Sequence, residues 1–207
     1  MKLFTIISFI GYSIAQTETD ATEKKFSAIV EFAYSQVTTA DDVGTWHKKI
    51  QNYGCHCFPD ATRVPGGKGA PVDDMDNLCR DLARCHACVE LDHGVSNIGL
   101  EKYKYVVTGS TIDCSSNTEA VKLQQCECDK QFAIALGGVW DDASFNTFYW
   151  GNKNNNDPQF DIVSTCTAGS GAGVQDACCG ASPDRRPYSS AVFECCSDGS
   201  IASVGGC

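Results

Sequence analysis

The chain has 207 residues, of which 43% are hydrophobic and 20% charged, and it contains fourteen cysteines. Its 16 Lys and Arg against 26 Asp and Glu give a formal net charge of −10, which argues against nucleic acids and anionic membranes as partners. The high, even cysteine count is typical of a protein stabilised by disulfides in an oxidising compartment, and it allows every cysteine to be paired.

Residues 1–15, MKLFTIISFIGYSIA, have the features of a secretory signal peptide: Lys2, a short apolar run and a small-x-small site that ends at Ala15. Cleavage there removes Lys2 and leaves a net charge of −11 on a chain that begins at Gln16. No later stretch has the length of a transmembrane helix. We therefore expect a soluble, extracellular protein.

Between residues 26 and 34, apolar side chains recur at the spacing of one helix face and predict a short helix. The sequence YGCHC follows at 53–57, and a glycine-containing loop leads to MDNLCRDLARCHAC. Pro71 and Asp73 are typical of a helix start. The helix predicted after them carries apolar and cysteine side chains on one face: Met75, Leu78, Cys79, Leu82, Cys85 and Val89.

This stretch resembles the secreted, calcium-dependent phospholipase A2 family, whose pattern combines Tyr-Gly-Cys-x-Cys, a Gly-rich calcium loop and Pro-x-Asp-x-x-Asp-x-Cys-Cys-x-x-His-Asp-x-Cys-Tyr. An ungapped alignment from Gly66 puts the family's His-Asp pair on Leu82 and Ala83. The residue types that match the pattern are Pro71, Asp73, Asp76, Cys79 and Cys85.

The two replaced positions are the chemical groups of the family. The resemblance implies that the histidine is the general base and that the aspartate is the carboxylate ligand of calcium. Leucine accepts no proton and alanine binds no cation. The sequence therefore predicts a member without catalytic residues and without a cofactor.

The calcium loop is also altered, because residues 58–65, FPDATRVP, make it six residues longer than the family's loop. Calcium requires six to eight oxygen ligands, so we do not expect it to bind here in the family's manner. Asp60, Asp73 and Asp76 remain as candidates for a weaker site. His86 lies one helical turn beyond Leu82, but no carboxylate stands beside it in the sequence, and we expect a surface or packed histidine.

Residues 102–105 and 112–136 resemble the family's two-stranded wing and second long helix. Tyr103 and Asp129 occupy the positions of the residues that orient the catalytic histidine, and we expect them to persist as a buried, hydrogen-bonded support. Two family bridges have lost both ends, at Leu78 with Ala135 and at Val95 with Val121.

The resemblance implies four disulfides: Cys57–Cys79, Cys85–Cys128, Cys114–Cys126 and Cys55–Cys166. Fifteen pairings are open to the remaining six cysteines: Cys88, Cys178, Cys179, Cys195, Cys196 and Cys207. Five of these lie in the tail and cannot close on themselves, so parity predicts a bridge from Cys88 to the tail. Adjacent cysteines rarely pair with each other, and each is expected to reach a different partner.

Residues 137–166 are rich in aromatic side chains, which either pack over the helices or form a face for a partner. The last segment contains two Cys-Cys pairs around Pro187-Tyr188 and resembles the dicysteine repeats of galaxin-type extracellular matrix proteins.

The fold class that follows is mainly α and disulfide-rich: a phospholipase A2-like domain with two long antiparallel helices, an N-terminal helix and a small β-wing, and a cysteine-rich hairpin tail. The predicted division is 1–15, 16–166 and 167–207. The function predicted is that of a secreted, inactive phospholipase A2-like protein with an extracellular matrix or protein partner. Two alternatives remain, a calcium-dependent phospholipase A2 and a module that binds lipid or fatty acid in an apolar channel.

Overall fold

The computed structural model describes residues 33–34, 37, 39–51, 53–57, 69–96, 98, 102–108, 111–142, 145–149, 160, 162–167, 174–182 and 184–207. The predicted signal peptide, Asp60 and nearly all of the predicted N-terminal helix lie outside these residues. Ala33 and Tyr34, at the end of that helix, are helical.

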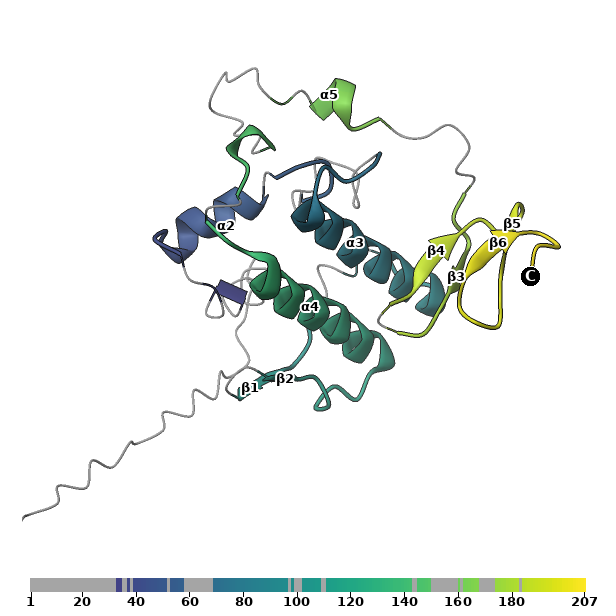
Figure 1. The fold of residues 1–207 in the computed structure, drawn as a ribbon. Coiled ribbons are helices and arrows are strands. Elements are labelled where there is room, and N and C mark those ends of the chain that lie inside the picture. The colour runs from purple at the N-terminus through teal and green to yellow at the C-terminus, as the bar shows by residue number, and fades with distance from the viewer. Residues whose placement is uncertain are drawn as a thin grey trace, which may run out of the picture.

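Two helices of twenty residues each, α3 (Asp74–His93) and α4 (Ala120–Val139), lie side by side in opposite directions (Figure 1). Helix α3 begins as predicted: Asp73 is its N-cap, and its carboxylate accepts a hydrogen bond from the Asp76 N–H at 3.0 Å. It ends at Gly94, whose positive φ of 63° suits glycine. The Cys85–Cys128 disulfide joins the two helices.

The main core lies at the end of the helix pair where α2 (Val43–Gln51) packs. Trp46 and Ile50 of α2 are fully buried, and Trp46 contacts Trp140 edge-on at the end of α4. Tyr53 packs against Phe145 and against Tyr149, which belongs to the short helix η2 (Thr147–Tyr149). These aromatic side chains therefore cover the core, although Phe148 is 42% exposed.

A small antiparallel hairpin, β1 (Val106–Thr108) with β2 (Thr111–Asp113), forms the predicted wing. The Cys114–Cys126 disulfide ties it to α4. Asn117 also bonds to the backbone of Lys104 in both directions, so the segment before β1, which carries Tyr103, is held close to the start of α4. Cys166, directly after α5 (Ile162–Thr165), is bridged to Cys55.

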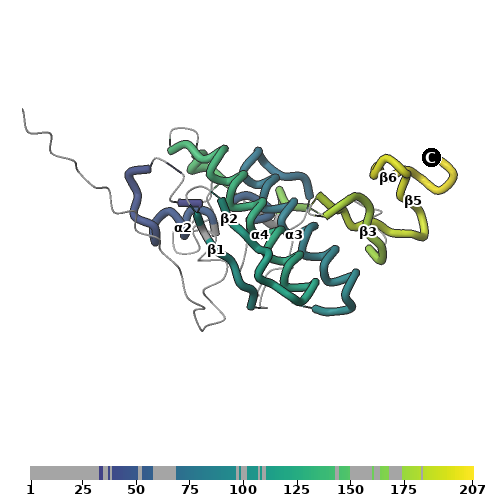
Figure 2. The backbone as a smooth tube through the Cα atoms, turned by 90° about the horizontal axis from the view of Figure 1, so that it is seen from below, coloured from purple at the N-terminus to yellow at the C-terminus, as the bar shows by residue number. Residues whose placement is uncertain are grey.

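The tail consists of two antiparallel hairpins beyond the C-terminal end of α3 (Figure 2). Strand β3 (Ala177–Cys179) pairs with β4 (Arg186–Tyr188), and β5 (Phe193–Cys195) pairs with β6 (Ile201–Ser203). Cys88 of α3 is bridged to the tail, as parity predicts, and no two adjacent cysteines pair with each other. The three tail bridges are Cys88–Cys178, Cys179–Cys195 and Cys196–Cys207.

All fourteen cysteines are bridged. The four bridges that the resemblance implies are present, so the two helices, the wing and the first loop are covalently connected. Each bridge limits the unfolded chain and stabilises the fold. The tail bridges do the same for hairpins that are too small to bury a core of their own.

Candidate functional site between the helices

A buried carboxylate lies between the two long helices. Asp129 of α4 is 4% exposed, and its Oδ1 lies 2.7 Å from Nε2 of His86 on α3. An ionised carboxylate only accepts hydrogen bonds, so His86 donates from Nε2 and only its Nδ1 is left as a proton acceptor. Asp129 therefore holds the orientation of a histidine, as its counterpart in the family pattern does, but the histidine is one turn further along α3.

This pair corrects one inference from the sequence. No carboxylate stands beside His86 in the sequence, but Asp129, 43 residues away, meets it across the helix pair. The residues next to His86 do not reveal this contact, because the antiparallel packing of α3 on α4 creates it. Two wider features together could have predicted it: His86 follows Leu82 by four residues on the same helix face, and the Cys85–Cys128 bridge brings α4 beside that part of α3.

Tyr103 completes the arrangement around Asp129. Burial raises the pKa of Tyr103 far above its ordinary value, and the nearby negative charge of Asp129 adds to the shift. A phenol in this setting stays protonated and is a hydrogen-bond donor. Tyr103 thus lies close to the His86–Asp129 pair, and the supporting role expected of Tyr103 and Asp129 stays a prediction.

The positions of the expected base and calcium ligand hold hydrocarbon. Leu82 is partly buried and packs against both hydrophobic clusters of the described residues, one around Trp46 and Phe132 and one around Val89 and Ile98. Ala83, also partly buried, follows it on α3. A leucine that joins two clusters contributes apolar burial at this place and supplies no group for proton transfer.

Asp76, a candidate calcium ligand, is used by the backbone of its own chain. It is fully buried, and its carboxylate accepts hydrogen bonds from the N–H groups of Cys55 at 2.9 Å, His56 at 2.7 Å and Val72 at 2.9 Å. Asp73 accepts hydrogen bonds from the Asp76 N–H and the Tyr53 hydroxyl. These carboxylates hold the 53–57 turn against the start of α3.

Gly69, at the end of the glycine-containing loop, lies beside the 53–57 turn. Gly69 has a positive φ of 84°, and a Cβ on it would lie 2.8 Å from the carbonyl oxygen of Thr167, so the backbone approach requires glycine. Its own carbonyl oxygen lies 3.1 Å from Nε2 of His56. Within the described ranges, no three His, Cys, Asp or Glu side chains gather in a way that suits a metal ion.

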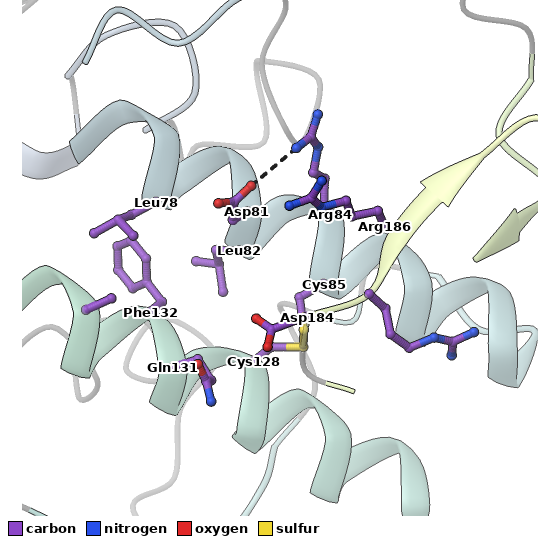
Figure 3. Close-up of a pocket in the computed structure, with 12 residues that line it drawn as sticks. Leu78, Asp81, Leu82, Arg84, Cys85, Cys128, Gln131, Phe132, Asp184 and Arg186 are labelled. Carbon is purple, nitrogen blue, oxygen red and sulfur yellow. Dashed lines mark hydrogen bonds and ion pairs between the residues drawn. A yellow bond between two sulfur atoms is a disulfide. The ribbon is translucent and has the colours of Figure 1, made fainter. Parts of the chain in front are cut away.

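A cavity of about 280 Å³ opens between α3, α4 and the β3–β4 hairpin (Figure 3). Its floor is apolar, with Leu78, Leu82 and Phe132, and it includes Ala135 at a position where the family pattern has a cysteine. Its charged walls come from α3 and the tail: Asp81, Arg84, Asp184, Arg185 and Arg186. The sequence predicts a residual channel with apolar walls, and the arginines from the tail were not foreseen.

The helices in the described part of the chain do not reach the combination of length and apolar character needed to cross a membrane.

An ion pair and the Cys88–Cys178 disulfide hold the tail against α3. In the ion pair, Arg185 of the β3–β4 hairpin contacts Asp92 near the end of α3. Its Nη2 also donates a hydrogen bond to the carbonyl oxygen of Cys178. The third wall of the cavity is thus held by one disulfide and one ion pair.

Comparison with known proteins gives one consistent result. A family model described as Phospholipase A2 matches residues 31–148. Phospholipase A2 of Calliactis polypus is 30% identical over 164 residues, which cover 77% of this chain and 93% of that protein. Group IID secretory phospholipase A2 of Mus musculus is 37% identical over 101 residues, covering 47% of this chain and 63% of the mouse protein, less than two thirds of its length. Acidic phospholipase A2 2 of Naja sagittifera is 32% identical over 96 residues, covering 46% of this chain and 71% of the snake protein.

Proposed function

The chain belongs to the phospholipase A2 family, and we propose that it is a secreted member without phospholipase activity that binds an extracellular protein or matrix partner. The observation that carries the proposal is the identity of two adjacent residues of α3. Leu82 and Ala83 stand where the family pattern has its base and its calcium ligand.

The surroundings of these residues support the same proposal. Ester hydrolysis in this family needs a base to activate water and a cation to stabilise the oxyanion. Leu82 is part of the hydrophobic packing, and the nearby carboxylates of Asp73 and Asp76 already accept hydrogen bonds from the chain itself. A calcium ion at Asp76 would have to compete with three backbone N–H groups.

The binding role draws on the tail and the surface. Fourteen bridged cysteines suit an oxidising, extracellular compartment. The docked dicysteine hairpins, which resemble a repeat of matrix proteins, expose Val192, Phe193 and Val204 to solvent. Rigid hairpins with exposed apolar side chains are suited to protein contact.

A second candidate function is hydrolysis by a relocated base, and the His86–Asp129 contact of 2.7 Å is the observation that favours it. In that arrangement Nδ1 of His86 would accept the proton. Ala87 follows His86 in the sequence, so the adjacent carboxylate of the family pattern is again missing. We therefore rank this function below the binding role.

The test is a turnover assay on the purified, oxidised full chain. Phospholipid in mixed micelles is incubated with calcium or with a chelator, and a bovine phospholipase A2 serves as the positive control. We expect no fatty acid release above buffer in either condition. Release that the chelator abolishes would overturn the proposal, and release that persists in chelator but is lost in His86→Gln would establish the second candidate.

The binding role is tested separately by immunolocalisation in the source tissue. We expect the protein in insoluble extracellular material or bound to a second protein. Recovery of the whole pool as a free, soluble monomer would refute that part of the proposal and leave the turnover result unaffected.

A further inference from the structure

The cavity beside Leu82 has an uneven distribution of charge. Arg84 of α3 and Arg186 of β4 approach each other at one side, whereas Asp184 lies beside the Cys85–Cys128 bridge (Figure 3). Arg84 bonds to Asp81 at 3.3 Å. Within the described ranges the guanidinium of Arg186 makes no hydrogen bond or ion pair, and Arg186 is exposed.

Two guanidinium groups at one opening are an unfavourable arrangement on their own. Burial lowers the pKa of Arg84, and the nearby positive charge of Arg80 and, less strongly, of Arg186 lowers it further. Asp81 offsets only part of this charge. An anion placed between Arg84 and Arg186 would relieve the repulsion and accept bidentate hydrogen bonds.

The floor sets a second requirement. Leu78, Leu82 and Phe132 offer hydrocarbon to whatever enters, and a polar group placed there would lose its hydration without gaining a partner. At roughly 30 Å³ for a water-sized group, a cavity of about 280 Å³ holds about nine or ten heavy atoms. The ligand that fits both requirements has a charged head and a short apolar body.

We infer that the cavity between α3, α4 and the β3–β4 hairpin binds a monoanionic amphiphile of about ten heavy atoms, with its carboxylate between Arg84 and Arg186 and its hydrocarbon on Leu82 and Phe132. Asp184 fixes the direction, because its charge repels the head from the other end. The inference goes beyond the proposed protein or matrix partner, and it rests on the proposed loss of the catalytic base only in that Leu82 forms part of the floor.

The tail is an obligatory wall of this site. Arg186 comes from β4, which reaches α3 through the Cys88–Cys178 bridge and the Arg185–Asp92 ion pair. Without that docking the helix pair keeps the apolar floor and Arg84 but loses the second guanidinium. The chain therefore has a ligand site that depends on its C-terminal hairpins.

Isothermal titration of the full chain with octanoate tests the inference, with acetate, octan-1-ol and octylamine as comparison ligands. We expect saturable binding of octanoate at one site per chain and much weaker binding of the three others, because each lacks the body or the negative head. Arg186→Gln should weaken octanoate binding about tenfold, the usual loss for one charge-assisted contact. Arg186→Lys should recover part of it.

Arg80→Gln is the matched control, since it removes the same charge from α3 one turn away from Arg84 and outside the cavity lining. Because the Arg80 charge also acts on Arg84 but Arg80 does not line the cavity, Arg80→Gln should change the octanoate affinity much less than Arg186→Gln does. The double variant Cys88→Ser with Cys178→Ser, checked for folding by circular dichroism, should lose affinity as Arg186→Gln does.

The inference is overturned if octanoate shows no saturable uptake, if octan-1-ol binds as tightly as octanoate, or if Arg186→Gln and Arg80→Gln have equal affinities. The assay contains no phospholipid and measures no turnover. A negative result here therefore leaves the proposed absence of phospholipase activity untouched, and turnover in the other assay would not explain a loss of octanoate binding.

Discussion

Substitution of Asp76 should lower the stability of the fold more than substitution of most other buried residues does, although we propose no catalytic role for Asp76. Its carboxylate accepts three backbone N–H groups, from Cys55, His56 and Val72, within 2.9 Å, and it is fully buried. Asp76→Asn keeps the shape but replaces one acceptor oxygen with a donor. One N–H then loses its partner and the other two bonds lose their charge assistance.

The magnitude follows from these three contacts. Loss of a charge-assisted hydrogen bond in a buried place costs about 1.5–3 kcal/mol, and neutralising two more costs about 0.5–1 kcal/mol each, so we expect a loss of about 2.5–5 kcal/mol in the free energy of unfolding. Asp74→Asn is the control. It makes the same change two residues earlier on an exposed side chain, where the helix dipole term is about 0.3–1 kcal/mol.

Guanidinium unfolding followed by circular dichroism at constant pH, with the disulfides intact, gives both values. The reasoning fails if Asp76→Asn and Asp74→Asn differ by less than about 1 kcal/mol, because the three short contacts would then contribute no more than an exposed charge does. A large loss in both variants would also contradict it, since Asp74 has no comparable contacts within the described ranges.

Two further predictions concern the tail and the buried phenol. The Cys88–Cys178 bridge closes a loop of about 23 residues when the path passes through the Cys57–Cys79 and Cys55–Cys166 bridges, so the Cys88→Ser, Cys178→Ser variant should lose about 3 kcal/mol in chemical unfolding; an unchanged midpoint would mean that the tail docks without it. Because the pKa of Tyr103 is raised in the folded chain, its contribution is complete below the ordinary tyrosine pKa of about 10 and falls as the pH rises above that value, by about 1.4 kcal/mol per pH unit. Tyr103→Phe should remove that slope between about pH 10 and 11 in unfolding experiments, and identical slopes in the two proteins would refute the assignment.

The sequence by itself determined the elements that depend on near neighbours and on cysteine pairing. Pro71 and Asp73 predicted the start of α3, and Asp73 is its N-cap because a short carboxylate can reach the first free N–H groups. Once the family resemblance had assigned four bridges, parity directed Cys88 to the tail. Leu82 and Ala83 were also visible as residue identities that no fold can alter.

Only the tertiary structure decided which side chains meet. Asp129 reaches His86 from another helix, Asp76 is taken by N–H groups about twenty residues earlier, and Arg186 enters the cavity from a hairpin at the far end of the chain. Residue types reveal what a side chain can donate or accept. The partner of a side chain depends on how distant segments pack. In this chain Asp73 and Asp76 accept hydrogen bonds from the chain itself, and arginines from the tail line the opening of an apolar cavity.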